Sequence, residues 1–221
     1  MPRSATQPAL TVGVELCGYG PLPVRDGTPD IPKDIETAAA GALGRIADEL
    51  ASRSDDRDRA LGLHLQTISA ANAAVDAWVH DHGQCADGDE ACSTAMFAAG
   101  IPAKAAGEQA LARLASTTSD PEAYALAIQS CGRSTAGDCA LLSSAQWARI
   151  EPDNMIPWLY LATEAQQRHD RSGFQAALTR ASAARYSNMY WDSLSGFIAS
   201  DTFGAQPEPI QPLLAIQLIG I

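Results

Sequence analysis

The sequence predicts an all-α fold of antiparallel helical hairpins, preceded by an irregular leader rich in proline and glycine. Alanine is abundant and is accompanied by leucine, arginine, glutamine and glutamate, which lose little side-chain freedom in a helix. Apolar residues recur at three- and four-residue steps from Asp34 onward, while the valine, isoleucine and threonine runs typical of strands are scarce. We predict three regions: a leader over 1–33, a helical-hairpin repeat domain over 34–205, and a proline-rich linker with an apolar tail over 206–221.

The leader holds six prolines and four glycines. Proline has no amide hydrogen and fixes its own φ angle, so no continuous helix is expected there. Leu10–Leu16 alternates enough to be a short extended segment. We expect this segment to lie across the helical body and not to form a sheet, because a lone strand is unstable.

Caps and breakers delimit the predicted helices. Helices are expected over 34–52, 56–81, 92–97, 103–115, 124–131, 139–150, 157–168 and 174–185, with a partial helix from Tyr190 to Leu194. The third and fourth are predicted to be separate, because Gly100–Ile101–Pro102 interrupts the pattern. Ser119–Glu122 is a strong start signal, since it combines a polar cap, a proline at the first helical position and a following acid.

The final stretch, 213–221, is almost wholly apolar. An array of helical repeats needs a terminal element with a polar outer face. We therefore expect the natural chain to continue beyond residue 221, with this tail starting a helix whose packing partner is absent. The alternative is that the leader or a binding partner buries the tail.

Charge and hydropathy narrow the classes of function. The formal net charge is −11 and no basic cluster offsets it, so neither a nucleic-acid surface nor attachment to anionic lipid is expected. No apolar run approaches the roughly 18–20 residues that span a bilayer, so this segment is not expected to insert into a membrane. The first residues also lack the apolar core of a signal peptide.

Four of the five cysteines form two close pairs, Cys85/Cys92 and Cys131/Cys139, each bracketing a polar turn that contains glycine. Facing positions beside a hairpin turn can bring Cα atoms within the roughly 7 Å that a disulfide requires. We predict both disulfides, and with them an oxidising compartment such as the periplasm. The alternative is a cytoplasmic protein with buried free thiols. Cys17 is left over.

A metal-binding or hydrolytic protein is the alternative function. His80 and His82, together with Cys85 and Cys92, could supply four ligands to a metal ion. The gaps between these residues do not match the spacing of a zinc knuckle, so no metal site is assigned.

No catalytic residue or cofactor is assigned either. The sequence has no nucleophile-elbow motif. The carboxylates of Glu151, Asp153 and Glu164 could act as acids or bases, but we expect them to lie on solvated faces.

Two helical hairpins of similar length occupy Tyr124–Asn188. Tyr124 and Trp158 lie 34 residues apart and each opens an alanine- and leucine-rich helical pattern, while Glu151–Asn154 closes the first hairpin. This spacing resembles the tetratricopeptide repeat. The positions that fit the pattern are Tyr124, Ala127, Ile128, Ala140 and Pro152 in the first copy, and Trp158, Leu161, Ala162, Ala165, Ala177, Leu178 and Ala184 in the second.

The resemblance implies a superhelical stack of hairpins that binds a protein or peptide and has no chemistry of its own. The whole chain also resembles uncharacterised helical proteins of Gram-negative bacteria, which assigns no activity. Tryptophan and tyrosine are favoured at interface hot spots. The candidates for contact with a partner are Trp158, Tyr160, Tyr186, Tyr190 and Trp191.

Overall fold

The computed structural model describes residues 14–16, 20–25, 28–132, 134, 136–190 and 201–219. Most of these residues are helical, as the sequence predicts. They fall into two compact units. The first unit joins the described residues up to Ala42 with those after 200, and the second runs from Leu43 to Tyr190. These units differ from the three predicted regions, because the leader and the C-terminal segment belong to one unit.

Short antiparallel strands form where the sequence predicts an unpaired extended segment. β1 (Val14–Leu16) pairs with β2 (Gly20–Leu22), and β3 (Val24–Arg25) pairs with β4 (Thr28–Pro29). Gly20 has a φ of 98°, a backbone conformation that only glycine adopts without steric cost. The expectation that this part of the leader forms no sheet is therefore wrong for the described strands, since a second strand follows closely enough to pair with the first.

The C-terminal segment of the first unit is helical. α9 (Asp201–Gly204) and α10 (Gln211–Ile219) are separated by the proline-containing break that the sequence predicts. Leu213 and Leu214 of α10 are buried. These two leucines are thus covered within the chain itself.

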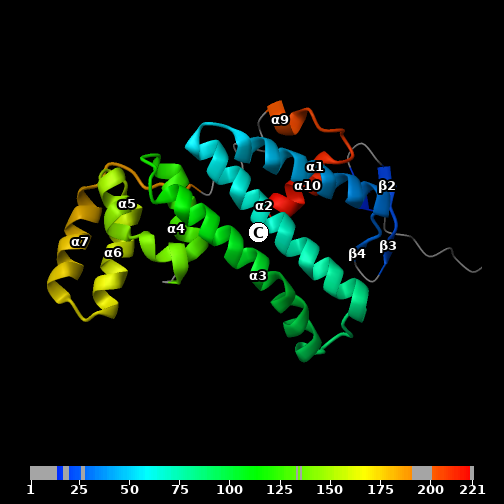
Figure 1. Cartoon of the computed structure of the whole chain (residues 1–221), viewed down its shortest axis with the longest axis horizontal. Helices are drawn as coiled ribbons and strands as arrows, with labels where there is room; N and C mark the ends of the chain where they lie inside the picture. Colours follow the sequence, from blue (N-terminus) through cyan, green and yellow to red (C-terminus); the bar gives the residue numbers. More distant parts are fainter. Residues whose placement is uncertain are drawn as a thin grey trace, which may run out of the picture. The chain divides into compact units, whose positions relative to one another are not determined.

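Three long helices begin the helical body: α1 (Lys33–Ser52), α2 (Asp56–His82) and α3 (Glu90–Ala115). α2 starts where the sequence predicts, because the Asp55 carboxylate accepts the first free backbone amides of that helix. Figure 1 shows α2 and α3 side by side, joined by a short turn. Gly107 of α3 lies against Thr67 of α2 so closely that a Cβ at the glycine would overlap the threonine side chain.

α3 continues through Pro102, so the prediction of two separate helices is wrong. Proline in a helix interior removes one backbone hydrogen bond and costs about 3 kcal/mol. Packing along α2 offsets this cost, because tertiary contacts supply most of the stability of a helix in a protein. Gly100, two residues before the proline, allows close contact with the Ala71 carbonyl of α2.

Two helical hairpins follow. α4 (Pro121–Cys131) begins at the predicted cap Asp120, and α6 (Met155–Gln167) pairs with α7 (Arg171–Ala183) close to the predicted bounds. The predicted helix over 139–150 is instead a 3-10 helix, η1 (Gly137–Leu141), followed by α5 (Ser144–Ile150).

A tertiary hydrogen-bond pair explains this break. The Tyr124 hydroxyl donates to the Ser143 carbonyl at 3.1 Å and accepts the Ser143 amide at 2.9 Å. The Ser143 amide therefore bonds to Tyr124 and not to a preceding helical turn. The Ser143 carbonyl also accepts the Gln146 and Trp147 amides, and its side chain caps α5, so the helix starts anew at this residue.

The core of the second unit is dominated by alanine around two large aromatic side chains. Tyr124 and Trp147 are both 0% exposed. The cluster comprises Ala60, Leu111, Ala115, Ala123, Tyr124, Ala125, Ala127, Ile128, Trp147 and Ile156. Within the described residues, none of the helices has the length and apolar character needed to cross a membrane.

Candidate functional site

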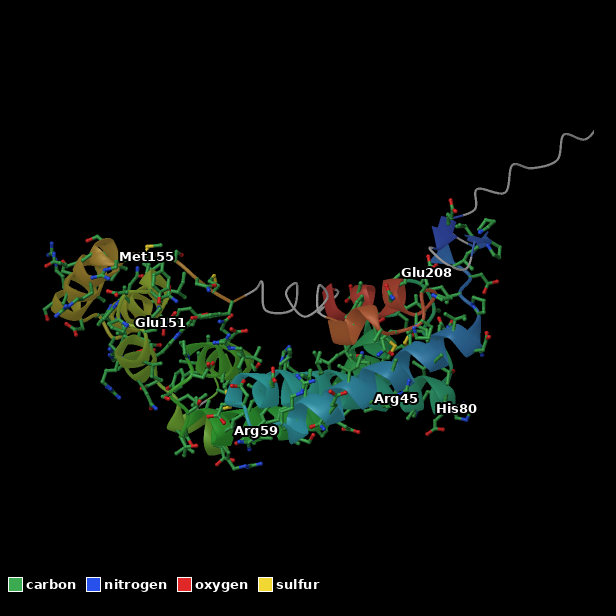
Figure 2. The ribbon with its side chains drawn as sticks, turned by 90° about the horizontal axis from the view of Figure 1, so that it is seen from above. Arg45, Arg59, His80, Glu151, Met155 and Glu208 are labelled. Carbon is green, nitrogen blue, oxygen red and sulfur yellow. A yellow bond between two sulfur atoms is a disulfide. The ribbon has the colours of Figure 1, made fainter. Side chains whose placement is uncertain are left out.

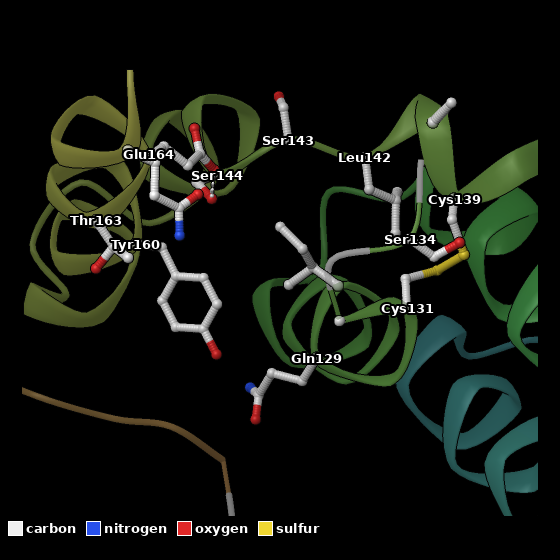
Figure 3. A pocket seen from close by; sticks show the side chains of 14 residues that line it. Gln129, Cys131, Ser134, Cys139, Leu142, Ser143, Ser144, Tyr160, Thr163 and Glu164 are labelled. Atoms are coloured by element: carbon white, nitrogen blue, oxygen red, sulfur yellow. Dashed lines mark hydrogen bonds between the residues drawn. A yellow bond between two sulfur atoms is a disulfide. The ribbon is translucent and has the colours of Figure 1, made fainter. Parts of the chain in front are cut away.

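A cavity of about 790 Å³ opens between α4 and α6, with η1 and the start of α5 completing its lining. We call it the α4–α6 groove. Its volume lies in the usual range of ligand pockets, roughly 300–1,000 Å³. The lining residues are Ile128, Gln129, Cys131, Gly132, Ser134, Cys139, Ala140, Leu142, Ser143, Ser144, Tyr160, Thr163, Glu164 and Gln167. Figure 3 shows the side chains around the cavity, with Gln129 and Cys131 on α4 and Tyr160, Thr163 and Glu164 on α6.

Tyr160 supplies the largest apolar surface of the groove. Its ring packs edge-on against Trp147, with the two ring centroids 5.5 Å apart. Because Trp147 is fully buried, this contact fixes the position of the Tyr160 ring. Ile128 and Leu142 add aliphatic surface to the lining, and Figure 3 shows Leu142 across the cavity from the Tyr160 ring.

The polar part of the groove carries hydroxyl and amide groups and one carboxylate. The buried Ser144 hydroxyl donates to Glu164 Oε1, and the guanidinium of Arg168 lies 3.7 Å from Glu164 Oε2. Gln129 donates to the carbonyl of Met189 at 3.1 Å. No lysine, arginine or histidine is among the described residues that line the groove. The arrangement suits hydrogen bonding to a ligand.

One wall of the groove is the Cys131–Cys139 disulfide. The two Cα atoms are 5.7 Å apart, and the residues are 6% and 3% exposed. Two side chains of α3 hold the same turn. Gln109 accepts the Asp138 backbone amide and donates to the Ala136 carbonyl, while Arg113 pairs with the Asp138 carboxylate.

The second cysteine pair lies elsewhere. Cys85 and Cys92 bridge the exposed turn between α2 and α3, with their Cα atoms 5.6 Å apart. Both predicted pairs therefore lie at disulfide distance. Cys17 lies outside the described residues.

The structure does not assemble the alternative metal site. Cys85 and Cys92 bond to each other, so neither offers a thiolate. The His82 ring stacks on Trp78 at 4.5 Å, and its Nδ1 lies 2.9 Å from the Trp78 carbonyl oxygen. Across the described part of the chain, no three His, Cys, Asp or Glu side chains gather closely enough to hold a metal ion.

A buried carboxylate, Glu151, lies at the junction of α5 and α6, near Met155 (Figure 2). Glu151 is 5% exposed, so the expectation of a solvated face is wrong. Its Oε2 accepts hydrogen bonds from Trp147 Nε1 at 3.2 Å and from Asn154 Nδ2 at 2.9 Å. Its Oε1 accepts the Tyr186 hydroxyl at 3.0 Å and the Tyr190 hydroxyl. We call these five residues the Glu151 cluster.

The Glu151 cluster holds the segment that follows α7 against the junction of α5 and α6. Burial, reinforced by the hydrogen bond to Glu151, raises the pKa of both Tyr186 and Tyr190, so both phenols remain protonated donors. Asn154 adds a further link, because its amide group donates to the Asn188 carbonyl at 2.7 Å and accepts the Asn188 amide at 3.0 Å. The local sequence signal for the cluster is the four-residue spacing of Trp147 and Glu151 at the end of α5, while no local pattern indicates Tyr186 and Tyr190.

Only one of the predicted aromatic contact residues lines the groove in the described structure, namely Tyr160. Trp158 donates from Nε1 to the Pro152 carbonyl at 2.9 Å, and the Arg180 guanidinium lies 5.9 Å from the centroid of its ring. Tyr186 and Tyr190 belong to the Glu151 cluster. Trp191 lies outside the described residues.

No protein-family model, curated protein or solved structure matches this chain.

Proposed function

We propose that this protein is a non-enzymatic helical-repeat scaffold that binds a peptide or an extended protein segment in the α4–α6 groove, in an oxidising compartment such as the periplasm. The main support for the proposal is the origin of the groove walls. Two walls are α4 and α6, which are the first helices of two successive hairpins. The residues that cap these two helices are separated by the interval of the predicted repeat.

The caps support a tetratricopeptide-like arrangement of the hairpins. Asp120 caps α4 by accepting the Ala123 amide at 2.8 Å, and Asn154 caps α6 by accepting the Ile156 amide at 3.1 Å. Asn188 accepts the Tyr190 amide at 2.7 Å in the same local manner. Asn154 and Asn188 are 34 residues apart, and Asp120 precedes Asn154 by the same interval. A fixed interval between helix starts, as between Asp120 before α4 and Asn154 before α6, is what a repeat array requires.

The chemistry of the groove favours a peptide as the ligand. A peptide backbone presents both donors and acceptors, which the amide and hydroxyl groups of Gln129 and Thr163 can match. Tyr160 offers a rigid aromatic surface to an apolar side chain. Since the chain carries a formal charge of −11 and no described lining residue is basic, a neutral or basic peptide is favoured over an acidic one.

The two cysteine pairs at disulfide distance support an oxidising location. Disulfides persist in the periplasm and outside the cell and are rare where thiols are kept reduced.

The test is selection of peptides from a random library against the oxidised protein, followed by titration of a selected fluorescent peptide. Thr163→Arg places a long charged side chain in the groove and should weaken binding about tenfold or more. Thr179→Arg is the matched control. Both threonines are exposed on a helix and donate to the carbonyl four residues earlier, but Thr179 lies on α7 outside the groove lining.

Equal affinity losses in Thr163→Arg and Thr179→Arg would place the binding surface elsewhere. If no peptide is retained above its scrambled counterpart, the groove does not bind peptides and the proposal fails.

A further inference from the structure

We propose that the Cys131–Cys139 disulfide is a redox-controlled lock on the α4–α6 groove. In the oxidised protein it holds η1 as a groove wall, and reduction by a dithiol releases that wall and weakens ligand binding. This inference rests on the proposed function and adds the regulation of the same groove.

The disulfide links the end of α4 to η1, two parts of the groove lining that belong to no common helix. α4 ends at Cys131, and the chain then leaves the helix at Gly132, whose φ is 56°. Cys139 lies within η1, which starts at Gly137 with a φ of 55°. Both cysteines line the cavity, and Figure 3 shows their sulfur–sulfur bond on the opposite side of the cavity from Tyr160.

The remaining contacts of η1 are weaker than a covalent bond. The Arg113–Asp138 ion pair has an exposed arginine, and exposed ion pairs contribute little because water screens them. Gln109 adds two hydrogen bonds from its side-chain amide. Beyond η1, Ser143 stays fixed by the buried Tyr124 hydroxyl. Release of the disulfide therefore loosens η1 and leaves α5 in place.

The reaction is ordinary thiol–disulfide exchange. A thiolate of the dithiol attacks one sulfur of the bridge and forms a mixed disulfide, while the other cysteine leaves as a thiolate and takes up a proton. The second thiol of the reductant then loses its proton, closes its own disulfide and releases the remaining cysteine. The cystine gains two electrons and two protons in total, and the dithiol loses them.

The groove controls access to this bond. Cys131 and Cys139 are almost fully buried and line the cavity, so a reductant reaches their sulfur atoms from the groove side. A bound peptide covers the same surface. Because coupling between two binding events is reciprocal, a ligand that needs the oxidised wall also protects the disulfide from reduction.

The Cys85–Cys92 disulfide provides an internal control. It closes a turn of similar length, seven residues of separation against eight. It lies between α2 and α3, and neither cysteine lines the groove.

The experiment measures amide hydrogen exchange over Gly137–Leu142 and the affinity of the selected peptide in the oxidised full chain, in C131S/C139S and in C85S/C92S. Removal of the groove disulfide should raise exchange over Gly137–Leu142 about tenfold and weaken the peptide by a similar factor. The C85S/C92S variant should change neither. C131A/C139A repeats the measurement without a buried hydroxyl, and circular dichroism verifies that the helices are retained.

A second readout follows the reduction of each disulfide by dithiothreitol, with alkylation and mass spectrometry. The peptide should slow reduction at Cys131–Cys139 and leave Cys85–Cys92 unaffected.

The outcomes separate this inference from the proposed function. If no peptide binds the oxidised protein, the proposed function fails, and the exchange data alone decide whether the wall is locked. If exchange over Gly137–Leu142 is unchanged without the groove disulfide, or rises equally in C85S/C92S, the lock is excluded whether or not a peptide binds.

Discussion

The two hairpins α4–α5 and α6–α7 have capped first helices at the same interval, yet they are stabilised in different ways. The first buries Tyr124 and Trp147 in the main core, and its second helix is broken at Ser143 by the Tyr124 hydroxyl. In the second hairpin α7 is unbroken. The buried side chains of α6 and α7 are mostly alanines. One hairpin is held by large apolar side chains and the other by small side chains with the Glu151 cluster at one end.

This comparison indicates that a regular spacing of helix starts does not imply a regular source of stability. Where a hairpin lacks large buried side chains, a satisfied polar cluster can fix its position, because buried hydrogen bonds are costly to leave unmade. Three predictions, each with its control variants, test how far the two hairpins differ in stability.

The largest effect is expected from Glu151→Ala. The change leaves the buried Trp147 Nε1–H without its acceptor, removes one of the two hydrogen bonds that Asn154 Nδ2 donates, and frees Tyr186 and Tyr190. Each buried donor left unpaired costs about 1–3 kcal/mol, so we expect a loss of roughly 3–5 kcal/mol in the free energy of unfolding. Guanidinium unfolding followed by circular dichroism measures the loss, and hydrogen exchange should show faster opening of α6–α7 than of α4.

Two further variants serve as comparisons for the stability of the Glu151→Ala protein. Glu151→Gln keeps the size but turns an amide donor toward other donors, so it should also destabilise. Glu49→Ala removes an exposed carboxylate paired with Arg53 and should cost no more than about 1 kcal/mol. A Glu151→Ala protein as stable as the Glu49→Ala protein would show that the cluster does not hold the second hairpin.

An intermediate effect is expected from the two matching caps. Asn154 is 0% exposed and bonds to Glu151, Ile156 and Asn188, whereas Asp120 is partly exposed. Asn154→Ala should therefore cost about 2–4 kcal/mol, against about 1–2 kcal/mol for Asp120→Ala, which removes an ordinary cap and an ion pair with the exposed Arg57. Denaturant midpoints of the two single variants give the comparison, and equal losses would mean that the bonds of Asn154 to Glu151 and Asn188 add no stability beyond the cap.

The smallest effect concerns His64 of α2, which faces the first hairpin through a 3.5 Å contact between its Nδ1 and the Ser130 hydroxyl. Burial, reinforced by the charge of Lys104, lowers the pKa of His64 below the ordinary histidine value of about 6.5. The folded state therefore binds fewer protons than the unfolded state, and stability is lost as the pH falls below 6.5 toward the folded-state pKa.

Urea unfolding at about pH 8 and about pH 5 measures this loss. His64→Gln should reduce the difference between the two pH values. His169→Gln, in the exposed turn between α6 and α7, is the control for the loss of a histidine. If both variants behave alike, the dependence on pH does not arise at the first hairpin.

Much of the fold follows from local sequence. The caps at Asp55 and Asp120 act as predicted because a short side-chain oxygen satisfies backbone amides within three residues. The cysteine pairs are likewise local. Two other predictions fail for non-local reasons: α3 continues through Pro102 because α2 packs along it, and the helix expected over 139–150 breaks because Tyr124 engages Ser143 from another helix.

The groove was predictable only in part. Tyr160 was named from its residue type, but the other lining residues have no special local pattern and are brought together by the packing of α4 against η1 and α6. Glu151 was placed on a solvated face, because nothing adjacent in sequence shows that Tyr186 and Tyr190 return to it. Long-range partners of this kind cannot be inferred from periodicity alone.

The glycines at the contacts between the long helices limit which substitutions this sequence can accept during evolution. A side chain at Gly62 would overlap the backbone of Ala51, which no second substitution can trim. A side chain at Gly107 would instead overlap the side chain of Thr67, so a prior Thr67→Gly change makes room for it. Gly62 can therefore not be replaced by any other residue, whereas Gly107 can be replaced only if the substitution at Thr67 comes first.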